Sequence, residues 1–326
     1  MKVSLVVPLY NEEHTVELFY QAIRQDRGLQ GWRIEIVFVD DGSQDSTGRR
    51  AKALTDADPD VVLLTFSRNF GKEAALFAGI EYATGDAVIP VDVDLQDPVS
   101  VIGQLITAWQ AGAEIVLAKR RHRDAESFFK RHSAALFYRV LRRISSTRIE
   151  ENVGDFRLLD RKVVDVIKGM PEQQVFMKGM LAWAGFDTVT VEYDRVARVA
   201  GRSKYNVWKL WNLALDGITS FSTVPLRMWT YIGGLISMST LLFAGYLLLD
   251  YAVNGNPVPG YSSLMVSILF LGGTQLIGIG ILGEYIGRIY LESKHRPRYV
   301  IKDVVIHRGD FPAGDNLTDR DASRHV

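Results

Sequence analysis

The stretch "IEIVFVDDGS", residues 34–43, joins a run of apolar and β-branched residues directly to a charged turn. Three further runs share this character and lie at residues 3–9, 61–66 and 87–91. Helix-like patterns separate the four runs, over about residues 12–26, 45–57 and 72–83. Strands that alternate with helices predict βαβ units, in which helices cover both faces of a parallel sheet. We therefore expect an α/β fold with a Rossmann-like, mostly parallel sheet.

Each of the four apolar runs ends in a polar turn. In chain order the turns read "YNEE", "DDGSQDS", "SRNFGKE" and "DVDLQDP". The carboxyl ends of parallel strands meet at one edge of a sheet, and ligands of such sheets bind beyond that edge. We therefore expect the functional site to lie where these four turns meet.

The fourth turn places Asp92 and Asp94 on the same side of an extended segment, because side chains alternate along a strand. Two carboxylates open to solvent suit Mg²⁺ or Mn²⁺, with phosphates and water as further ligands. In the second turn, Asp40 and Asp41 suit a ribose or a base edge, although an Asx turn that caps the next helix through Ser43 or Asp45 would also explain the motif. The chain has no cysteine, no Walker motif and no G-x-G-x-x-G before its first helix, which argues against thiolate, P-loop and dinucleotide sites.

Residues 229–249 and 264–283 contain no charged side chain, and each run has about the 20 residues that a helix needs to cross a bilayer. We expect transmembrane helices at 229–251 and 264–287, joined by a periplasmic loop at 252–263. Arginines and lysines flank the outer ends of this hairpin, so the positive-inside rule places both termini and the catalytic domain in the cytoplasm. A buried hairpin within a soluble core is the alternative.

The remaining boundaries follow from composition. A cytoplasmic catalytic domain is expected over residues 1–205, and its segment 119–148 is basic and amphipathic. Residues 206–228 are expected to form interfacial helices, and residues 288–326 a cytoplasmic tail whose polar end is disordered. Basic amphipathic helices favour anionic lipid surfaces, although packing within the domain would also explain these segments. No feature predicts a nucleic-acid partner.

Six motifs are spread over nearly the whole chain, to about Lys302. They read "VVPLYNEE", "FVDDGSQDST", "SRNFGKEAALFAGIEYATGD", "VDVDLQDP", "ENVGDFRLLDR" and "GRSKYN". Together they resemble the family 2 glycosyltransferases, which have a GT-A fold. With its two apolar C-terminal runs, the chain is most similar to the polyprenyl-phosphate glycosyltransferases, and among these to the ones that glucosylate bactoprenol (undecaprenyl phosphate) for the O-antigen of lipopolysaccharide.

The resemblance implies roles for individual residues. A pocket for a UDP-sugar donor would contain Pro8, Tyr10, Glu12, Asp40, Asp41, Lys72, Asp92 and Gln96. Asp92 and Asp94 would bind the metal, Mg²⁺ or Mn²⁺, and Asp155 and Asp94 would take part in catalysis. The acceptor phosphate would contact Arg120, Arg131, Arg157, Arg202 and Lys204. For the arginines of the basic segment, contact with lipid headgroups is an equal alternative.

The implied reaction is inverting, metal-dependent transfer of glucose from UDP-glucose to undecaprenyl phosphate, at the cytoplasmic face of the bacterial inner membrane. Related enzymes assemble as homotetramers, so we expect this assembly and contacts with membrane lipids. One alternative is the same reaction with GDP-mannose or a UDP-aminoarabinose derivative as donor. A processive polysaccharide synthase is disfavoured because the Q-x-x-R-W motif is missing. A catalytically silent membrane scaffold that binds a nucleotide sugar is the alternative from another class.

Overall fold

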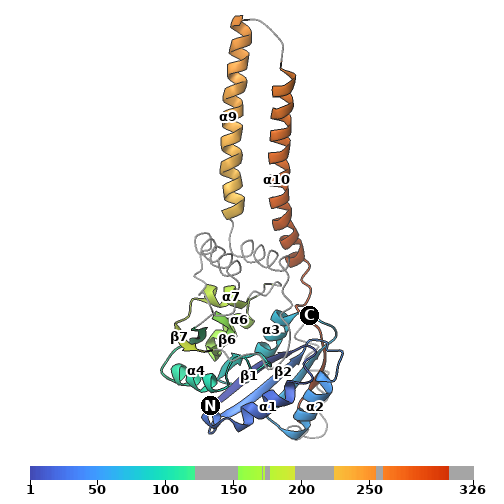
Figure 1. Ribbon diagram of the computed structural model, residues 1–326, viewed down its shortest axis with the longest axis vertical. Helices are drawn as coiled ribbons and strands as arrows, with labels where there is room; N and C mark the ends of the chain where they lie inside the picture. The colour runs from blue at the N-terminus through green and yellow to red at the C-terminus, as the bar shows by residue number, and fades with distance from the viewer. Residues whose placement is uncertain (122–152, 171, 173–176, 195–223, 255–259, 308–326) are drawn as a thin grey trace. The chain divides into compact units, whose positions relative to one another are not determined.

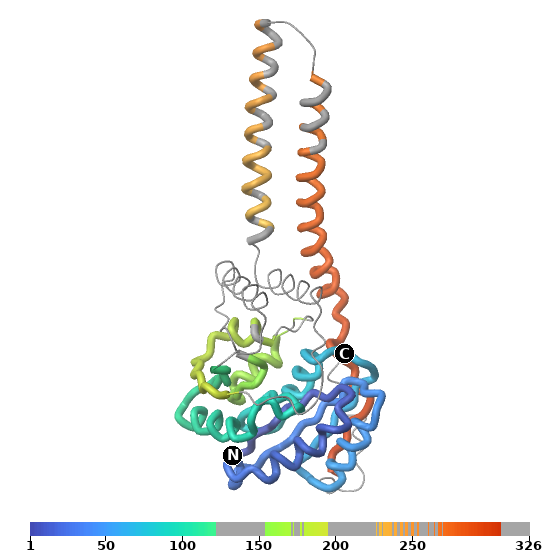
Figure 2. The backbone as a smooth tube through the Cα atoms, viewed as in Figure 1, coloured from blue at the N-terminus to red at the C-terminus, as the bar shows by residue number. Residues whose placement is uncertain are grey.

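The computed structural model of the chain describes residues 1–121, 153–170, 172, 177–194, 224–254 and 260–307 (Figure 1). The chain divides into two compact units. The first unit is made of residues 1–131, 149–204 and 297–326, and the second of residues 132–148 and 205–296. Figure 2 traces the backbone through the parts of each unit.

The first unit is built on a sheet whose described strands follow the order β7-β5-β6-β4-β1-β2-β3-β8. Their bounds are β1 Lys2–Leu9, β2 Arg33–Asp40, β3 Val61–Phe66, β4 Ala87–Pro90, β5 Ile115–Arg120, β6 Val153–Asp160, β7 Thr188–Tyr193 and β8 Ile301–Val305. The pairings of β1 with β2 and β4, of β2 with β3, and of β5 with β7 are parallel. Only β6 and β8 run antiparallel to their neighbours in the described part of the sheet. The predicted α/β fold with a mostly parallel sheet is confirmed, and the four apolar runs are β1 to β4.

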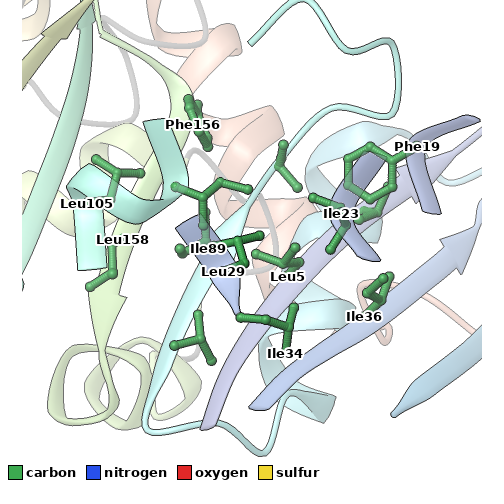
Figure 3. Packing of buried hydrophobic residues seen from close by; sticks show 14 of the residues in the cluster. Leu5, Phe19, Ile23, Leu29, Ile34, Ile36, Ile89, Leu105, Phe156 and Leu158 are labelled. Carbon is green, nitrogen blue, oxygen red and sulfur yellow. The ribbon is translucent and has the colours of Figure 1, made fainter. Parts of the chain in front are cut away.

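Helices cover both faces of this sheet. The bounds are α1 Val16–Gln25, η1 Arg27–Leu29, α2 Thr47–Ala57, α3 Lys72–Tyr82, α4 Ser100–Gln110, α6 Arg161–Lys168 and α7 Met177–Ala184. Alternate residues of each strand face opposite sides, so Leu5 of β1 packs with α1 and α4, whereas Val6 packs with α3, α6 and α7. Figure 3 shows the first of these cores, with Leu5 and Ile89 of the sheet near Phe19 of α1 and Leu105 of α4.

Helix α3 lies unusually close to the sheet. A Cβ atom at Gly79 would lie 2.3 Å from Cγ1 of Val6 and 3.1 Å from Cγ2 of Val39, so only glycine fits without displacing β1 and β2. The helix follows Gly71, which has a φ of 101° that favours glycine. This close packing fixes Lys72, the first residue of α3, at the carboxyl edge of the sheet.

The last described strand comes from the C-terminal tail. Strand β8 pairs with β3 so that Ile301 lies opposite Phe66 and Val305 opposite Leu63. The preceding Tyr299 stacks on Phe66, with ring centroids 5.1 Å apart. The sequence pattern predicted a cytoplasmic tail here and no strand, and the polar end of the tail lies outside the described residues.

The second unit contains α9 (Val224–Asn254) and α10 (Tyr261–Ser293). The two helices contact each other at Gly278, where a Cβ atom would lie 2.0 Å from Nε1 of Trp229. Both helices extend past the predicted spans and include charged residues, Asp250 in α9 and Glu284 in α10.

Among the residues described, no helix is both long and apolar enough to cross a membrane. The prediction of a transmembrane hairpin at 229–251 and 264–287 is therefore not supported. Most of the predicted interfacial region 206–228 lies outside the described residues, and its last part is the beginning of α9.

Candidate active site

The site lies at the carboxyl edge of the sheet, where β1 to β4 end. Strand β6 runs antiparallel to β4, so its first residues lie at this same edge. Val88 of β4 is opposite Leu159 of β6, so Asp155, near the start of β6, and Asp92, just after the end of β4, lie toward the same end of this strand pair. Two carboxylates that are far apart in the sequence thus become neighbours.

Lys72 joins these two carboxylates. Its Nζ lies 2.6 Å from Oδ1 of Asp92 and 2.9 Å from Oδ2 of Asp155. The three side chains remain accessible, with exposed fractions of 44% for Lys72, 33% for Asp92 and 26% for Asp155. Burial lowers the pKa of Lys72, but the two carboxylates raise it by more, so the pKa lies well above its ordinary value and the amine stays charged. The cluster is a solvent-accessible group of fixed charges from three elements.

Asp41 ties the end of β2 to the loop before α3. Its carboxylate accepts the backbone N–H of Phe70 at 2.6 Å and that of Gly71 at 2.9 Å. The next residue, Gly42, has a φ of 71°, and a Cβ atom there would lie 2.7 Å from the backbone of Arg68. Burial of the carboxyl raises the pKa of Asp41, although the two N–H donors act in the opposite direction. Asp41 therefore holds the loop that carries Lys72.

Asp40 is also buried. Its Oδ1 accepts the backbone N–H of Ser43 at 2.9 Å, and a Cβ atom at Gly48 of α2 would lie 2.7 Å from its Oδ2. The Asx turn considered for this segment is present at Asp45, whose Oδ1 accepts the backbone N–H of Thr47 at 2.9 Å. The hydrogen bond from Ser43 leaves Asp40 able to contact a ligand as well, because a carboxylate accepts several hydrogen bonds.

The end of β1 supplies the other predicted donor contacts. Pro8 lies in β1 and is half-buried, whereas Tyr10 is 44% exposed. The Glu12 carboxylate accepts the hydroxyl of Thr15 at 2.9 Å, and the Glu12 N–H donates to Oγ1 of Thr47 at 2.7 Å. Tyr10 is therefore accessible to a ligand at this turn.

The segment after β4 holds the predicted metal ligands. Asp92 and Asp94 provide only oxygen ligands, and Oδ1 of Asp94 also accepts the N–H of Gln96 at 3.2 Å. The described residues contain no group of three or more His, Cys, Asp or Glu side chains arranged to hold a metal. A pair of carboxylates nevertheless fits Mg²⁺ or Mn²⁺, which take their other ligands from phosphates and water. The ammonium of Lys72 held by Asp92 shows that this carboxylate attracts a cation.

Gln96 and Arg157 are buried to a degree that their predicted roles did not anticipate. Gln96 is 3% exposed, Arg157 is 4% exposed, and in the part of the chain described neither Nε2 of Gln96 nor Nε of Arg157 has a hydrogen-bond partner. Burial lowers the pKa of Arg157, while Asp155 and Glu73 act in the opposite direction. Arg157 donates from Nη2 to the carbonyl of Gly154, so it supports the backbone beside Asp155.

Arg120 lies at the end of β5, near the same edge. Its Nε donates to the hydroxyl of Tyr193 at 3.2 Å, and its Nη2 lies 3.7 Å from Oδ1 of Asp97. The Tyr193 hydroxyl in turn donates to Asp97. Sequence reasoning assigned no role to Asp97 or Tyr193. The position of Asp97 at the end of the "DVDLQD" turn was the available signal.

The structure thus brings together Lys72, Asp92 and Asp155 by direct ion pairs, with Asp41 behind the loop that carries Lys72. Most of the other described members of the predicted set lie on the turns and strand ends of the same edge: Pro8, Tyr10, Glu12, Asp40, Asp94, Gln96 and Arg120. Arg157 lies in the middle of β6. The remaining predicted residues, Arg131, Arg202 and Lys204, lie outside the described residues.

Comparison with known proteins identifies the family. The family model described as glycosyl transferase family 2 matches residues 4–168. A protein of Shigella phage SfV named bactoprenol glucosyl transferase is 59% identical over 93% of this chain and 99% of its own length. The prophage bactoprenol glucosyl transferase homolog of Escherichia coli (strain K12) is 57% identical over the same shares of the two chains.

Among solved structures, the glucosyl-3-phosphoglycerate synthase of Mycobacterium tuberculosis covers 67% of this chain and 76% of its own, with 19% identity and a TM-score of 0.48. That likeness is too distant to carry an argument about ligands. The family match and the two named relatives, which agree over nearly the full chain, decide the question: the chain belongs to glycosyl transferase family 2 and is a glycosyltransferase.

Proposed function

We propose that the chain transfers glucose from UDP-glucose to the phosphate of a polyprenyl lipid, with inversion at the anomeric carbon. The observation that carries the proposal is the likeness to bactoprenol glucosyl transferases, 57% to 59% identical over 93% of this chain. This likeness extends past the family domain at residues 4–168, so it includes the C-terminal helices as well as the sheet edge.

The donor side of the site follows from the accessible carboxylates after β4. Asp92 and Asp94 would hold Mg²⁺ or Mn²⁺, which neutralises the charge that develops on the departing UDP. Tyr10, which is 44% exposed, would lie against the uridine, next to Asp40. Asp41 would act through the loop it holds, since its carboxylate already accepts two backbone N–H groups.

Asp155 is the residue we propose to act at the reacting carbon. A phosphate monoester is largely ionised at neutral pH, so the acceptor needs little help to lose a proton. The Asp155 carboxylate would instead orient the acceptor and stabilise the positive charge that forms at the anomeric carbon. Lys72, 2.9 Å from Asp155, fixes the position of this carboxylate relative to Asp92.

The acceptor requires that the enzyme work at a membrane surface, because a polyprenyl phosphate resides in the bilayer. We propose the cytoplasmic face of the bacterial inner membrane, where nucleotide sugars are present. Arg120 is a described cation at the sheet edge that suits an incoming phosphate, because its side chain is 27% exposed and its planar guanidinium donors match phosphate oxygens.

The test is transfer of radiolabelled sugar from a panel of UDP- and GDP-sugars into lipid extracts, with purified full-length chain, polyprenyl phosphate and Mg²⁺ or Mn²⁺. We expect a lipid product from UDP-glucose that mild acid hydrolyses. Asp155→Asn should abolish the product, whereas Asp165→Asn, which removes a charge from an exposed carboxylate of α6, should leave it unchanged.

Each other outcome contradicts part of the proposal. Product from GDP-mannose or a UDP-aminoarabinose derivative, in place of UDP-glucose, would overturn the donor. Binding of a nucleotide sugar without transfer from any donor would identify a scaffold. Full activity after chelation of divalent ions would overturn the role of Asp92 and Asp94.

A further inference from the structure

Three polar side chains beside the site, Asp97, Tyr193 and Arg120, are joined in a row by hydrogen bonds. The Tyr193 hydroxyl donates to Asp97 and accepts the Nε–H of Arg120 at 3.2 Å, so both hydrogen-bonding functions of the phenol are used. Asp97 and Tyr193 are 5% and 4% exposed, whereas the Arg120 side chain is 27% exposed. This row of hydrogen-bonded side chains therefore begins in the interior, at Asp97, and ends in the accessible guanidinium of Arg120.

The backbone places this guanidinium beside the reacting groups. Strands β5 and β7 pair in parallel with Arg120 opposite Tyr193. A Cβ atom at Gly154 would lie 3.4 Å from Nη2 of Arg120, so the guanidinium rests on the residue that precedes Asp155. Burial lowers the pKa of Arg120, but Tyr193, Asp97 and Asp92 raise it by more, which places Arg120 within the field of the carboxylate predicted to bind metal.

We propose that Tyr193 and Asp97 are positioning residues that hold the Arg120 guanidinium in place at the sheet edge to bind a substrate phosphate. The inference rests on the proposed function, since it deepens the same site. Arginine is suited to this task because its planar donors match the oxygens of a phosphate, and a fixed guanidinium loses less rotational freedom on binding. The phosphate belongs either to the donor diphosphate or to the acceptor monoester, and both present the same chemistry.

The hydroxyl of Tyr193 is separable from the packing of its ring. The ring meets Phe156 edge-to-face, with centroids 6.0 Å apart, and phenylalanine preserves that contact. Burial and the Asp97 carboxylate raise the pKa of Tyr193 to about 12, so the phenol remains a donor at every working pH. Tyr193→Phe therefore removes the hydrogen bonds and keeps the apolar contact.

The experiment is a double-mutant cycle on the full-length chain with Tyr193→Phe, Arg120→Gln and the double variant. Calorimetry would measure the affinity for UDP with Mn²⁺ and for geranyl phosphate, and transfer assays would give kcat and the KM of each substrate. We expect Tyr193→Phe to weaken binding of at least one phosphate ligand by about three- to tenfold, the effect of one hydrogen bond. In the Arg120→Gln background the same change should alter that affinity by less than about twofold, because its effect passes through Arg120.

The matched control is Tyr20→Phe on α1. It also removes a hydroxyl that donates to a carboxylate, that of Asp58 at 2.9 Å. It should leave both affinities unchanged. If Tyr193→Phe weakens the affinity for UDP, Arg120 binds the donor diphosphate. If it weakens the affinity for geranyl phosphate, Arg120 binds the acceptor.

Equal losses from Tyr193→Phe in both backgrounds, or a lower melting temperature with unchanged affinities, would show a purely structural role and overturn the proposal. Failure of the wild-type chain to bind either ligand would overturn it as well. If the wild-type chain transfers no sugar but the variants still show the coupled effect on binding, the proposed function alone would be overturned.

Discussion

Two clusters of charged side chains lie at opposite ends of the parallel sheet, and they differ in how fully they are paired and covered. At the amino end, Glu35 is 4% exposed and accepts hydrogen bonds from Nζ of Lys2 at 2.7 Å, from the Ser4 hydroxyl, and from both N–H and hydroxyl of Thr84. The Ser4 hydroxyl also accepts the N–H of Gly85 at 2.8 Å.

The cluster at the carboxyl end is more open. Lys72, Asp92 and Asp155 are each at least one-quarter exposed, and the buried neighbours Gln96 and Arg157 each keep a nitrogen without a hydrogen-bond partner among the described residues. A fully paired buried cluster stabilises one conformation, whereas an accessible cluster with spare hydrogen-bonding capacity can bind a ligand. Exposure and hydrogen-bond pairing therefore distinguish the two clusters, although both consist of charged residues that look alike in the sequence.

The largest effect is expected at the open cluster. Asp155→Asn and Asp92→Asn should each lower kcat/KM by about a hundredfold or more, because charge stabilisation in the transition state contributes this much in enzymes. The melting temperature should stay near that of the wild type. Steady-state transfer assays together with thermal unfolding check both statements, and a variant that loses activity only by unfolding would contradict the division between the clusters.

Lys72→Met should have the next largest effect. It removes the cation that joins Asp92 to Asp155, and loss of hydrogen bonds to charged groups corresponds to about a ten- to hundredfold loss of kcat/KM. Lys72→Arg keeps the charge and should recover part of the activity. Equal kcat/KM for Lys72→Met and the wild type would show that this bridge is not needed for transfer.

The paired cluster should respond in stability and not in catalysis. Glu35→Gln should lower the free energy of unfolding by about 1–3 kcal/mol, the cost of leaving buried donors poorly matched. Chemical denaturation measures this loss, and kcat of the folded fraction should be unchanged. A fall in kcat without a fall in stability would instead assign Glu35 a role in catalysis.

The same variant should show a characteristic pH dependence. Burial raises the pKa of Glu35, but the hydrogen bonds from Lys2, Ser4 and Thr84 lower it by more, so the pKa lies below its ordinary value of 4.5. A lowered pKa in the folded state stabilises the fold above the unfolded pKa and loses that contribution as the pH falls. The stability difference between wild type and Glu35→Gln should therefore shrink as the pH drops below 4.5, and a difference that grows there would contradict the assignment.

The smallest effect is expected at an exposed pair near the same end of the sheet. Arg33 lies 2.8 Å from Asp60, but its side chain is 64% exposed. Arg33→Ala should change the free energy of unfolding by less than about 1 kcal/mol, as for most surface ion pairs. A loss of stability as large as that of Glu35→Gln would mean that the exposed fraction of a charged side chain does not predict its contribution to the stability of this sheet.

The sequence predicted the parts of this molecule that have local signals. The runs at β1 to β4 are apolar and lie between helical patterns, so their alternation was sufficient to predict a parallel sheet with a site at its carboxyl edge. The apolar runs near the C-terminal end likewise predicted long helices at the positions of α9 and α10, although not their full extent.

Other features depend on partners that are distant in the chain. Strand β8 has only five residues, and nothing near Ile301 indicates that its partner is β3. The pairing of Lys72 with Asp155 depends on the antiparallel direction of β6, which no local pattern specifies. The motif "DVDLQD" suggested metal binding by Asp92 and Asp94, but the link from Asp97 to Tyr193 requires β7 to lie beside β5.

The position of β8 has a consequence for how the chain is made. Phe66 and its partner Ile301 are separated by about 235 positions along the chain, and α9 and α10 lie between them. At ~5–20 residues per second, a ribosome would need roughly 10 to 50 seconds to progress from one to the other. During that interval β3 is an unpaired sheet edge, which is a site of intermolecular strand pairing. The sheet edge is therefore closed only after both long helices have been synthesised, and a chain that stops before β8 would expose an aggregation-prone edge.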